Sequence, residues 1–159
     1  MRPRKYPLDP LARLRAKQVD DAGRLLAKAV SVRQEAERAE QAAVAERDGA
    51  AEVARVVNEG ERAALERGEL CAADLVRAAA WSVRVEAERA ALDLGVKRAA
   101  DQARAAEGGV GTARDGVARA RADAEVVERD RAKWEGAARK KEEAAEEETA
   151  AEAFRGRRP

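Results

Sequence analysis

Several residue types are absent or rare in this sequence of 159 residues, and each absence removes a class of function. There is no histidine, which excludes a histidine base, a histidine metal ligand and a histidine pH switch. The single cysteine, Cys71, permits no internal disulfide and no cysteine-based metal site. No apolar run approaches the roughly 18 residues that a membrane span needs, and the basic start leads into no apolar segment. We therefore expect neither a transmembrane helix nor a signal peptide.

Large apolar side chains are also scarce. Isoleucine is absent, aromatic residues number four, and Leu, Val and Phe together number 26, whereas alanine alone numbers 41. So few large side chains cannot fill a conventional globular core. Charged residues make up 40% of the chain but balance to a net charge of +1, unlike a disordered chain of high net charge. Ala, Glu, Lys, Leu and Arg form about 65% of the residues, which is typical of long helices and coiled coils.

Proline occurs only near the ends of the chain, so nothing between Leu11 and Arg158 forbids a helix. Leu8-Asp9-Pro10 predicts a helix start, with Asp9 as N-cap, Pro10 as the first helical residue and Leu8 packed on the first turn.

Apolar residues then recur at alternating spacings of three and four, which predicts heptad seams. The first predicted seam is Ala22, Leu25, Ala29, Val32, Ala36, Ala39, Ala43, Glu46, Ala50, Val53 and Val57. The second is Val96, Ala99, Ala103, Ala106, Val110, Ala113, Val117, Ala120, Ala124 and Val127. An offset stretch between them is Ala72, Val76, Ala79, Val83, Ala87, Ala90 and Leu94.

The chain is expected to bend near Gly68, where a glycine follows the end of one periodic segment and a new period begins. Gly108–Gly111 is the alternative position, disfavoured because the second seam keeps its phase through Val110, although these glycines leave the continuity of the second helix open. The fold predicted is all-α, one long antiparallel two-helix coiled-coil hairpin over residues 1–159. Helix one covers about 10–66, the bend about 66–71 and helix two about 71–152.

In this hairpin, facing residues have numbers that sum to about 137. Leu25 and Leu26 then lie opposite Gly111 and Thr112, so that large residues meet small ones as close helix packing requires. Trp134 lies opposite the N-terminal segment, where we expect it to pack on Tyr6 or Leu8. Trp81 lies near the bend, either as an exposed binding anchor or beside the seam. Two seams in one chain can satisfy each other, so a monomer is expected.

No catalytic pattern is apparent. Gly109-Val110-Gly111 lacks the Lys-Ser/Thr ending and the preceding strand of a phosphate loop. Carboxylate pairs such as Asp20-Asp21 or Glu142-Glu143 would be solvated faces of a rod without a pocket. We expect no enzyme activity, no cofactor, no metal and no small-molecule substrate.

Charge is distributed unevenly along the chain. Residues 1–20 carry six basic and two acidic groups, and residues 135–152 carry three basic and seven acidic groups. The hairpin gathers both blocks at the end where the termini lie. They either neutralise one another or form a docking surface. Nucleic-acid binding is disfavoured, because the basic groups lack interleaved aromatic residues and the chain is neutral overall.

The order of these features resembles the FliJ/YscO (SctO) family, the central stalk proteins of bacterial type III export machines. The resemblance covers most of the chain. It rests on a basic start with Tyr6-Pro7-Leu8 and Leu11-Ala12-Arg13-Leu14-Arg15, on the Gly68-Glu69-Leu70 bend followed by Asp74-Leu75, on an aromatic residue at Trp81, and on Lys133-Trp134 before the Glu-rich run Glu142–Glu152.

The resemblance implies a non-enzymatic, two-helix antiparallel coiled coil that sits in the pore of a hexameric export ATPase, stimulates it and reaches toward the export gate protein. Export chaperones are further candidate partners, and the implied location is cytoplasmic, peripheral to the inner membrane when assembled. By position, the residues expected to meet the ATPase are Arg2, Arg4, Lys5, Arg13, Arg15, Lys17, Lys133, Trp134, Arg139 and Lys140. Those expected to face the gate are Arg67, Glu69, Leu70 and Leu75.

Two other functions are compatible with the sequence. One is a structural coiled-coil scaffold or adaptor, such as a peripheral-stalk subunit of a rotary ATPase, although those tend to be dimers of unbroken helices. The other is a small nucleic-acid-binding hairpin. Flagellar and injectisome machines are not distinguished by the sequence.

Overall fold

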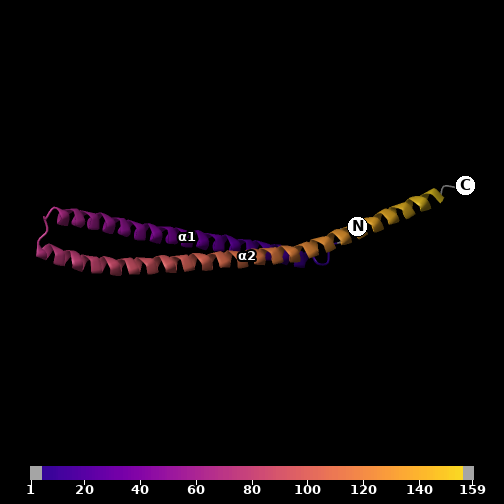
Figure 1. Ribbon diagram of the computed structural model, residues 1–159. Helices are drawn as coiled ribbons and strands as arrows, with labels where there is room; N and C mark the ends of the chain where they lie inside the picture. The colour runs from indigo at the N-terminus through magenta and orange to yellow at the C-terminus, as the bar shows by residue number, and fades with distance from the viewer. Residues whose placement is uncertain (1–4, 156–159) are drawn as a thin grey trace. The chain divides into compact units, whose positions relative to one another are not determined.

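The computed structural model describes residues 5–155, without the side chains of Ala153 and Arg155. Two helices account for nearly all of this range: α1 (Asp9–Glu66) and α2 (Ala72–Arg155), joined by a five-residue bend (Figure 1). The prediction of an all-α antiparallel hairpin of two long helices is confirmed. Helix α2 runs through Gly108–Gly111 without a break.

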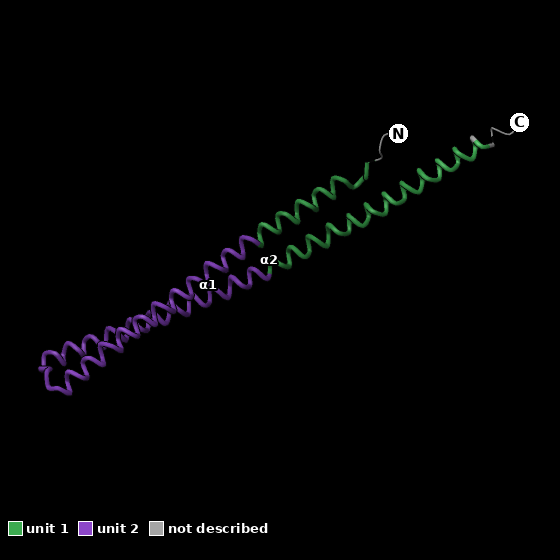
Figure 2. Tube along the Cα trace, turned by 90° about the horizontal axis from the view of Figure 1, so that it is seen from above, with its two compact units in different colours: residues 1–26, 112–159 green, residues 27–111 purple. Residues whose placement is uncertain are grey.

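The chain divides into two compact units (Figure 2). Unit 1 comprises residues 1–26 and 112–159, so it pairs the start of α1 with the C-terminal part of α2. Unit 2 comprises residues 27–111, which include the rest of both helices and the bend.

The bend lies at Gly68, as the sequence predicts, and the glycine ends α1 there. Gly68 has a φ of +72°, the left-handed conformation that side chains disfavour and glycine adopts freely. The Glu69 amide donates to the Ala64 carbonyl (3.0 Å) and the Gly68 amide to the Leu65 carbonyl (3.0 Å), which is the Schellman pattern that ends a helix. Beyond the bend, the Asp74 carboxylate accepts a hydrogen bond from the Cys71 amide (2.9 Å) and so caps the start of α2.

The start of α1 differs by one residue from the prediction. The Leu8 carbonyl accepts the hydrogen bond of the Ala12 amide (2.9 Å), so the helix begins at Asp9 rather than at Pro10. The Asp9 carboxylate is directed at two arginines instead of the helix amides.

The second predicted seam is confirmed, because all ten of its residues are buried or half-buried. Val110 is fully enclosed, and Val117 and Val127 are 8% and 7% exposed. These valines are among the largest side chains that the seam places between the helices. Val110 therefore forms the centre of the core of unit 2, and Val117 and Val127 form the centre of the core of unit 1.

The first predicted seam is half wrong. Its row of alanines at seven-residue intervals is half-buried, but Leu25 and Val53 between them are 65% and 62% exposed. The other half of the true seam lies one residue later along the helix. It consists of Leu26, Arg33, Glu40, Arg47, Ala54 and Glu61, all half-buried. The alanine row has mostly apolar residues on one side and mostly long polar residues on the other, and periodicity does not tell which side faces the partner helix. Arg33 of this row pairs with Glu107 of α2 (3.2 Å), so its charged end is engaged between the helices.

Two further expectations are wrong. Every residue of the offset stretch from Ala72 to Leu94 is exposed. Gly108, Gly109 and Gly111 are also exposed, and a Cβ added at each would meet no atom within 4 Å. These glycines therefore do not mark a close helix–helix contact with large residues such as Leu25.

The pairing of the helices lies close to the predicted register. Arg15 pairs with Asp123 and Arg33 with Glu107, pairs whose residue numbers add to 138 and 140. The difference from 137 is less than one helical turn.

Candidate functional site

Unit 1 contains a connected set of side chains centred on Tyr6. This side chain is only 6% exposed, and its ring packs edge-on against Trp134 with centroids 5.7 Å apart. The predicted contact between Trp134 and the N-terminal segment is thereby confirmed. The Tyr6 hydroxyl donates to the Asp130 carboxylate (2.6 Å), and the Arg131 guanidinium lies 5.7 Å from the ring centroid. Residues just before α1 are thus held on the surface of α2.

Burial and the adjacent carboxylate raise the pKa of Tyr6 to about 12. Desolvation is the larger cause, because the phenolate would lose water without gaining a full set of partners. The hydrogen bond to Asp130 acts in the same direction, and the positive charge of Arg131 opposes both. Tyr6 is therefore a neutral donor at physiological pH.

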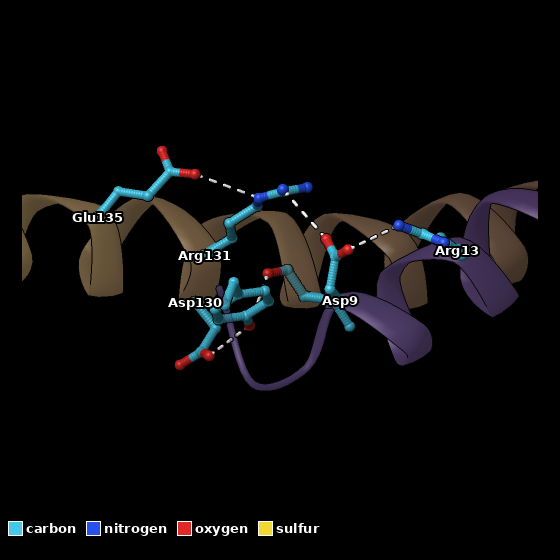
Figure 3. A network of polar contacts seen from close by, with 7 residues as sticks. Asp9, Arg13, Asp130, Arg131 and Glu135 are labelled. Carbon is cyan, nitrogen blue, oxygen red and sulfur yellow. Dashed lines mark hydrogen bonds and ion pairs between the residues drawn. The ribbon is translucent and has the colours of Figure 1, made fainter. Parts of the chain in front are cut away.

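A chain of ion pairs crosses between the helices at the start of α1, through Asp9 and Arg131 (Figure 3). Asp9 accepts from Arg13 of its own helix (3.1 Å) and from Arg131 of α2 (3.1 Å), and Arg131 also contacts Glu135 (3.2 Å). The Asp9 side chain is 30% exposed, so these interactions are only partly screened by water. The network fixes the position of the α1 start along α2.

Some of the basic residues expected at the ATPase end are engaged in this packing. Arg15 pairs with Asp123 (2.9 Å), and its side chain is 33% exposed. Arg13 pairs with Asp9 but remains 83% exposed, which leaves it available to a partner. Trp134 is half-buried against Tyr6.

The remaining basic residues of that set that the structure describes are exposed side chains of unit 1, contributed by both helices and the segment before α1. They are Lys5, Lys17, Lys133, Arg139 and Lys140. Arg2 and Arg4 lie outside the described residues.

The C-terminal part of α2 carries the acidic run. From Arg139 to Glu152 every side chain is exposed, including all six glutamates between Glu142 and Glu152. Among the described residues, the ion pairs that join the two helices in unit 1 involve Asp9 and Asp123 rather than these glutamates. The acidic run is consequently open to solvent or to a partner.

At the bend, the predicted gate-facing residues lie on one short segment. Arg67 and Glu69 form an ion pair (2.7 Å), Leu70 is half-buried, and Leu75 is 46% exposed. The hydrogen bond from the Cys71 thiol to Asp74 (3.0 Å) is the largest cause of the lowered pKa of Asp74, followed by the bond from the Cys71 amide. Asp74 is therefore ionised at any physiological pH and keeps the start of α2 capped.

Trp81 lies half-buried in unit 2, beside an open groove of about 640 Å³ between α1 and α2. Ala50 and Ala54 line the groove from α1, and Val85 and Leu92 line it from α2. Trp81 therefore flanks the seam rather than standing free as an anchor.

Sequence reasoning singled out Tyr6 and Trp134 but missed Asp130 and Arg131. Two signals could have found them. Tyr6 is the only tyrosine, and its hydroxyl needs a polar partner near Trp134. Arg131 has the opposite charge to Asp9 at the number that the hairpin register assigns, within about one turn.

Within the described residues there is no cluster of acidic and cysteine side chains that could hold a metal ion. The described helices also include none that is long and apolar enough to cross a membrane.

Comparisons with known proteins agree with this architecture. A family model described as YscO-like protein matches residues 3–153. Among solved structures, that of CT670 from Chlamydia trachomatis, described as a YscO homologue, superposes with a TM-score of 0.81 at 18% identity and covers 96% of this chain and 93% of its own. No curated protein sequence matches significantly. The low identity makes the structural match evidence of the fold alone.

Proposed function

Because the chain belongs to the YscO-like family of type III secretion stalk proteins, we propose that it acts as a non-enzymatic stalk that binds the hexameric export ATPase of its machine and stimulates ATP hydrolysis. The observation that carries the proposal is the family match over nearly the whole chain. Flagellar and injectisome machines both fit it.

Unit 1 is the part proposed to enter the ATPase ring. The Tyr6 network holds the N-terminal segment on α2, so that basic side chains of both helices are presented together. A pair of helices in a six-fold ring cannot match six identical surfaces with one apolar patch. Long-range attraction between charges tolerates this mismatch better than close packing does. Lys5, Lys17 and Lys133 are exposed and suited to that role.

The bend is proposed to face the export gate at the cytoplasmic side of the inner membrane. Its Schellman turn and the Asp74 cap fix the geometry of the segment. The exposed side chains of Arg67, Glu69 and Leu75 would then supply the contacts. Contact with export chaperones belongs to the same proposal.

The test is reconstitution with the hexameric export ATPase of the same organism. A Lys5→Glu, Lys17→Glu, Lys133→Glu variant should lose most of the stimulation of ATP hydrolysis while keeping its helix content. Rising salt should weaken the parent complex, most strongly as the Debye length falls below about 10 Å.

The matched control reverses three exposed basic residues of unit 2, Lys28, Arg38 and Arg62. This control should stimulate the ATPase as the parent does. Equal stimulation by both variants would exclude the basic residues of unit 1 as the contact. No stimulation by the parent itself would contradict the stalk function and favour a structural scaffold.

A further inference from the structure

The segment of α2 between Ala72 and Leu94 is apolar on two opposite faces. One face is turned to α1 and includes half-buried Ala78, Trp81 and Val85. On the other face, Val76 and Val83 are 71% and 68% exposed. We call this second face the outer face. It consists of Ala72, Ala73, Val76, Ala79, Ala80, Val83, Ala87, Ala90, Ala91 and Leu94, all exposed.

The outer face is a continuous stripe. At 3.6 residues per turn its ten members fall within about 120° of the helix circumference, and the segment is roughly 35 Å long. No charged residue lies inside the stripe before Lys97. A helix that is apolar on both sides is normally covered on both sides, and α1 covers only one. The spacings of three and four along the stripe are those of a seam for another helix.

The charges at the edges of the stripe indicate which helix fits. Arg77 and Arg84 follow one edge, and Glu86 and Asp93 follow the other, all four exposed. Arg77 is also paired with Asp74 of its own helix, which leaves Arg84 as the less engaged cation of that edge. The stripe thus carries opposite charges on its two edges.

We propose that the outer face binds the outer face of a second copy of this chain, with the two α2 segments parallel. A two-fold axis along the helices brings opposite edges together, so Arg84 of each copy lies beside Glu86 of the other. The two residues differ in height by about 3 Å, within reach of long side chains. An antiparallel pair would instead place arginine edge against arginine edge and acidic edge against acidic edge.

The dimer replaces the monomer expected from the sequence. The expectation of a monomer assumed that α1 and α2 cover each other's apolar residues. The outer face is an apolar row of α2 that α1 does not cover. The proposal uses unit 2 alone and is independent of binding to an ATPase.

Sedimentation equilibrium tests the association at protein concentrations up to about 0.5 mM, where even a weak dimer assembles. The parent should dimerise, and Val83→Glu should weaken the dimer at least about tenfold with unchanged helix content. Val53→Glu is the matched control, since Val53 is a similarly exposed valine of unit 2 outside the outer face, and it should dimerise as the parent does. A parent that stays monomeric over this range, or a Val83→Glu variant that dimerises equally well, would overturn the proposal.

Charge exchange and disulfide trapping test the orientation. Arg84→Glu and Glu86→Arg should each weaken the dimer, and the double variant should restore it, because the exchanged charges meet again across a parallel interface. In a Cys71→Ala background, Val76→Cys should form a disulfide-linked dimer under mild oxidation. An antiparallel pair centred on Val83 would place residue 76 near residue 90 of the other copy. Lack of the 76–76 disulfide in a dimeric protein, or lack of restoration, would contradict the parallel arrangement.

Discussion

Tyr6 is expected to be the side chain that holds the segment before α1 on unit 1. Truncating a buried aromatic residue to alanine costs about 3–5 kcal/mol in a well-packed core. Tyr6 is buried, but Trp134 beside it is half-buried, so the lower end applies and Tyr6→Ala should cost about 3 kcal/mol. Tyr6→Phe keeps the ring against Trp134 and loses only the hydrogen bond to Asp130. A hydrogen bond to a charged group contributes about 1.5–3 kcal/mol to stability. Asp130 is exposed, so the low end of this range applies and Tyr6→Phe should cost about 1.5 kcal/mol.

Trp134 reports the outcome directly once Trp81 is replaced by phenylalanine. In that background, Tyr6→Ala should shift the tryptophan emission to the red and lower the urea midpoint of unit 1, whereas Tyr6→Phe should lower the midpoint and leave the emission in place. Phe154→Ala is the control, because Phe154 is 74% exposed and should change neither. An unchanged emission and midpoint in Tyr6→Ala would refute the account of how the N-terminal segment is held.

Three further predictions concern the pH dependence and the stability of each unit. Since Tyr6 is the only tyrosine, the ultraviolet absorbance of the phenolate should titrate near pH 12 instead of 10. Because folding raises the pKa of Tyr6, the neutral hydroxyl stabilises the folded state below pH 10, and this stabilisation is lost as the pH rises through 12. A titration midpoint near pH 10 would mean that Tyr6 is exposed. Asp74→Ala removes the cap of α2 and should cost about 1 kcal/mol, with faster amide hydrogen exchange just after the bend. Asp93→Ala is the control and should leave that exchange unchanged. Equal protection of these amides in both variants would contradict the cap. Val110→Ala removes part of a fully enclosed side chain and should cost about 2 kcal/mol in thermal unfolding. Val126→Ala at a 66% exposed position should cost little, and equal losses would mean that the core is not centred on Val110.

The hairpin could be predicted because its signals are local and strong. Gly68 is the residue that a left-handed turn requires, and the absence of proline from Leu11 to Arg158 leaves both helices free to form. The α2 seam from Val96 to Val127 could also be identified, since one row is apolar and its neighbours are largely charged.

The face of α1 could not be predicted, because the alanine row from Ala22 to Val57 has apolar residues on one side and long polar residues on the other. Apolar content favours the side of Leu25 and Val32. The structure uses the side of Leu26, Arg33 and Arg47. The choice depends on how α2 lies against α1, and no single-helix pattern contains that information.

The same limit explains the offset stretch of α2. Val76 and Val83 were assigned to a seam because of their spacing, and the spacing is that of a seam. Their partner is not α1, however, since both valines face away from it. Periodicity identifies an apolar row on a helix, but it does not tell whether α1 covers that row.

The Tyr6 network was only partly accessible for a related reason. Tyr6 and Trp134 are conspicuous as two of four aromatic residues, but Asp130 and Arg131 are two charges among 63. Their role depends on the register of the hairpin to within one turn, and an alanine-rich seam is compatible with several registers.

The proposed stalk function is tested most directly by native mass spectrometry of the chain mixed with its export ATPase and ATP. The account predicts one chain, or one outer-face dimer of the chain, for each ATPase hexamer, with loss of that species for the Lys5→Glu, Lys17→Glu, Lys133→Glu variant and its retention for the reversal of Lys28, Arg38 and Arg62. Six chains for each hexamer, a complex that survives the unit 1 reversal, or no complex at all would contradict it.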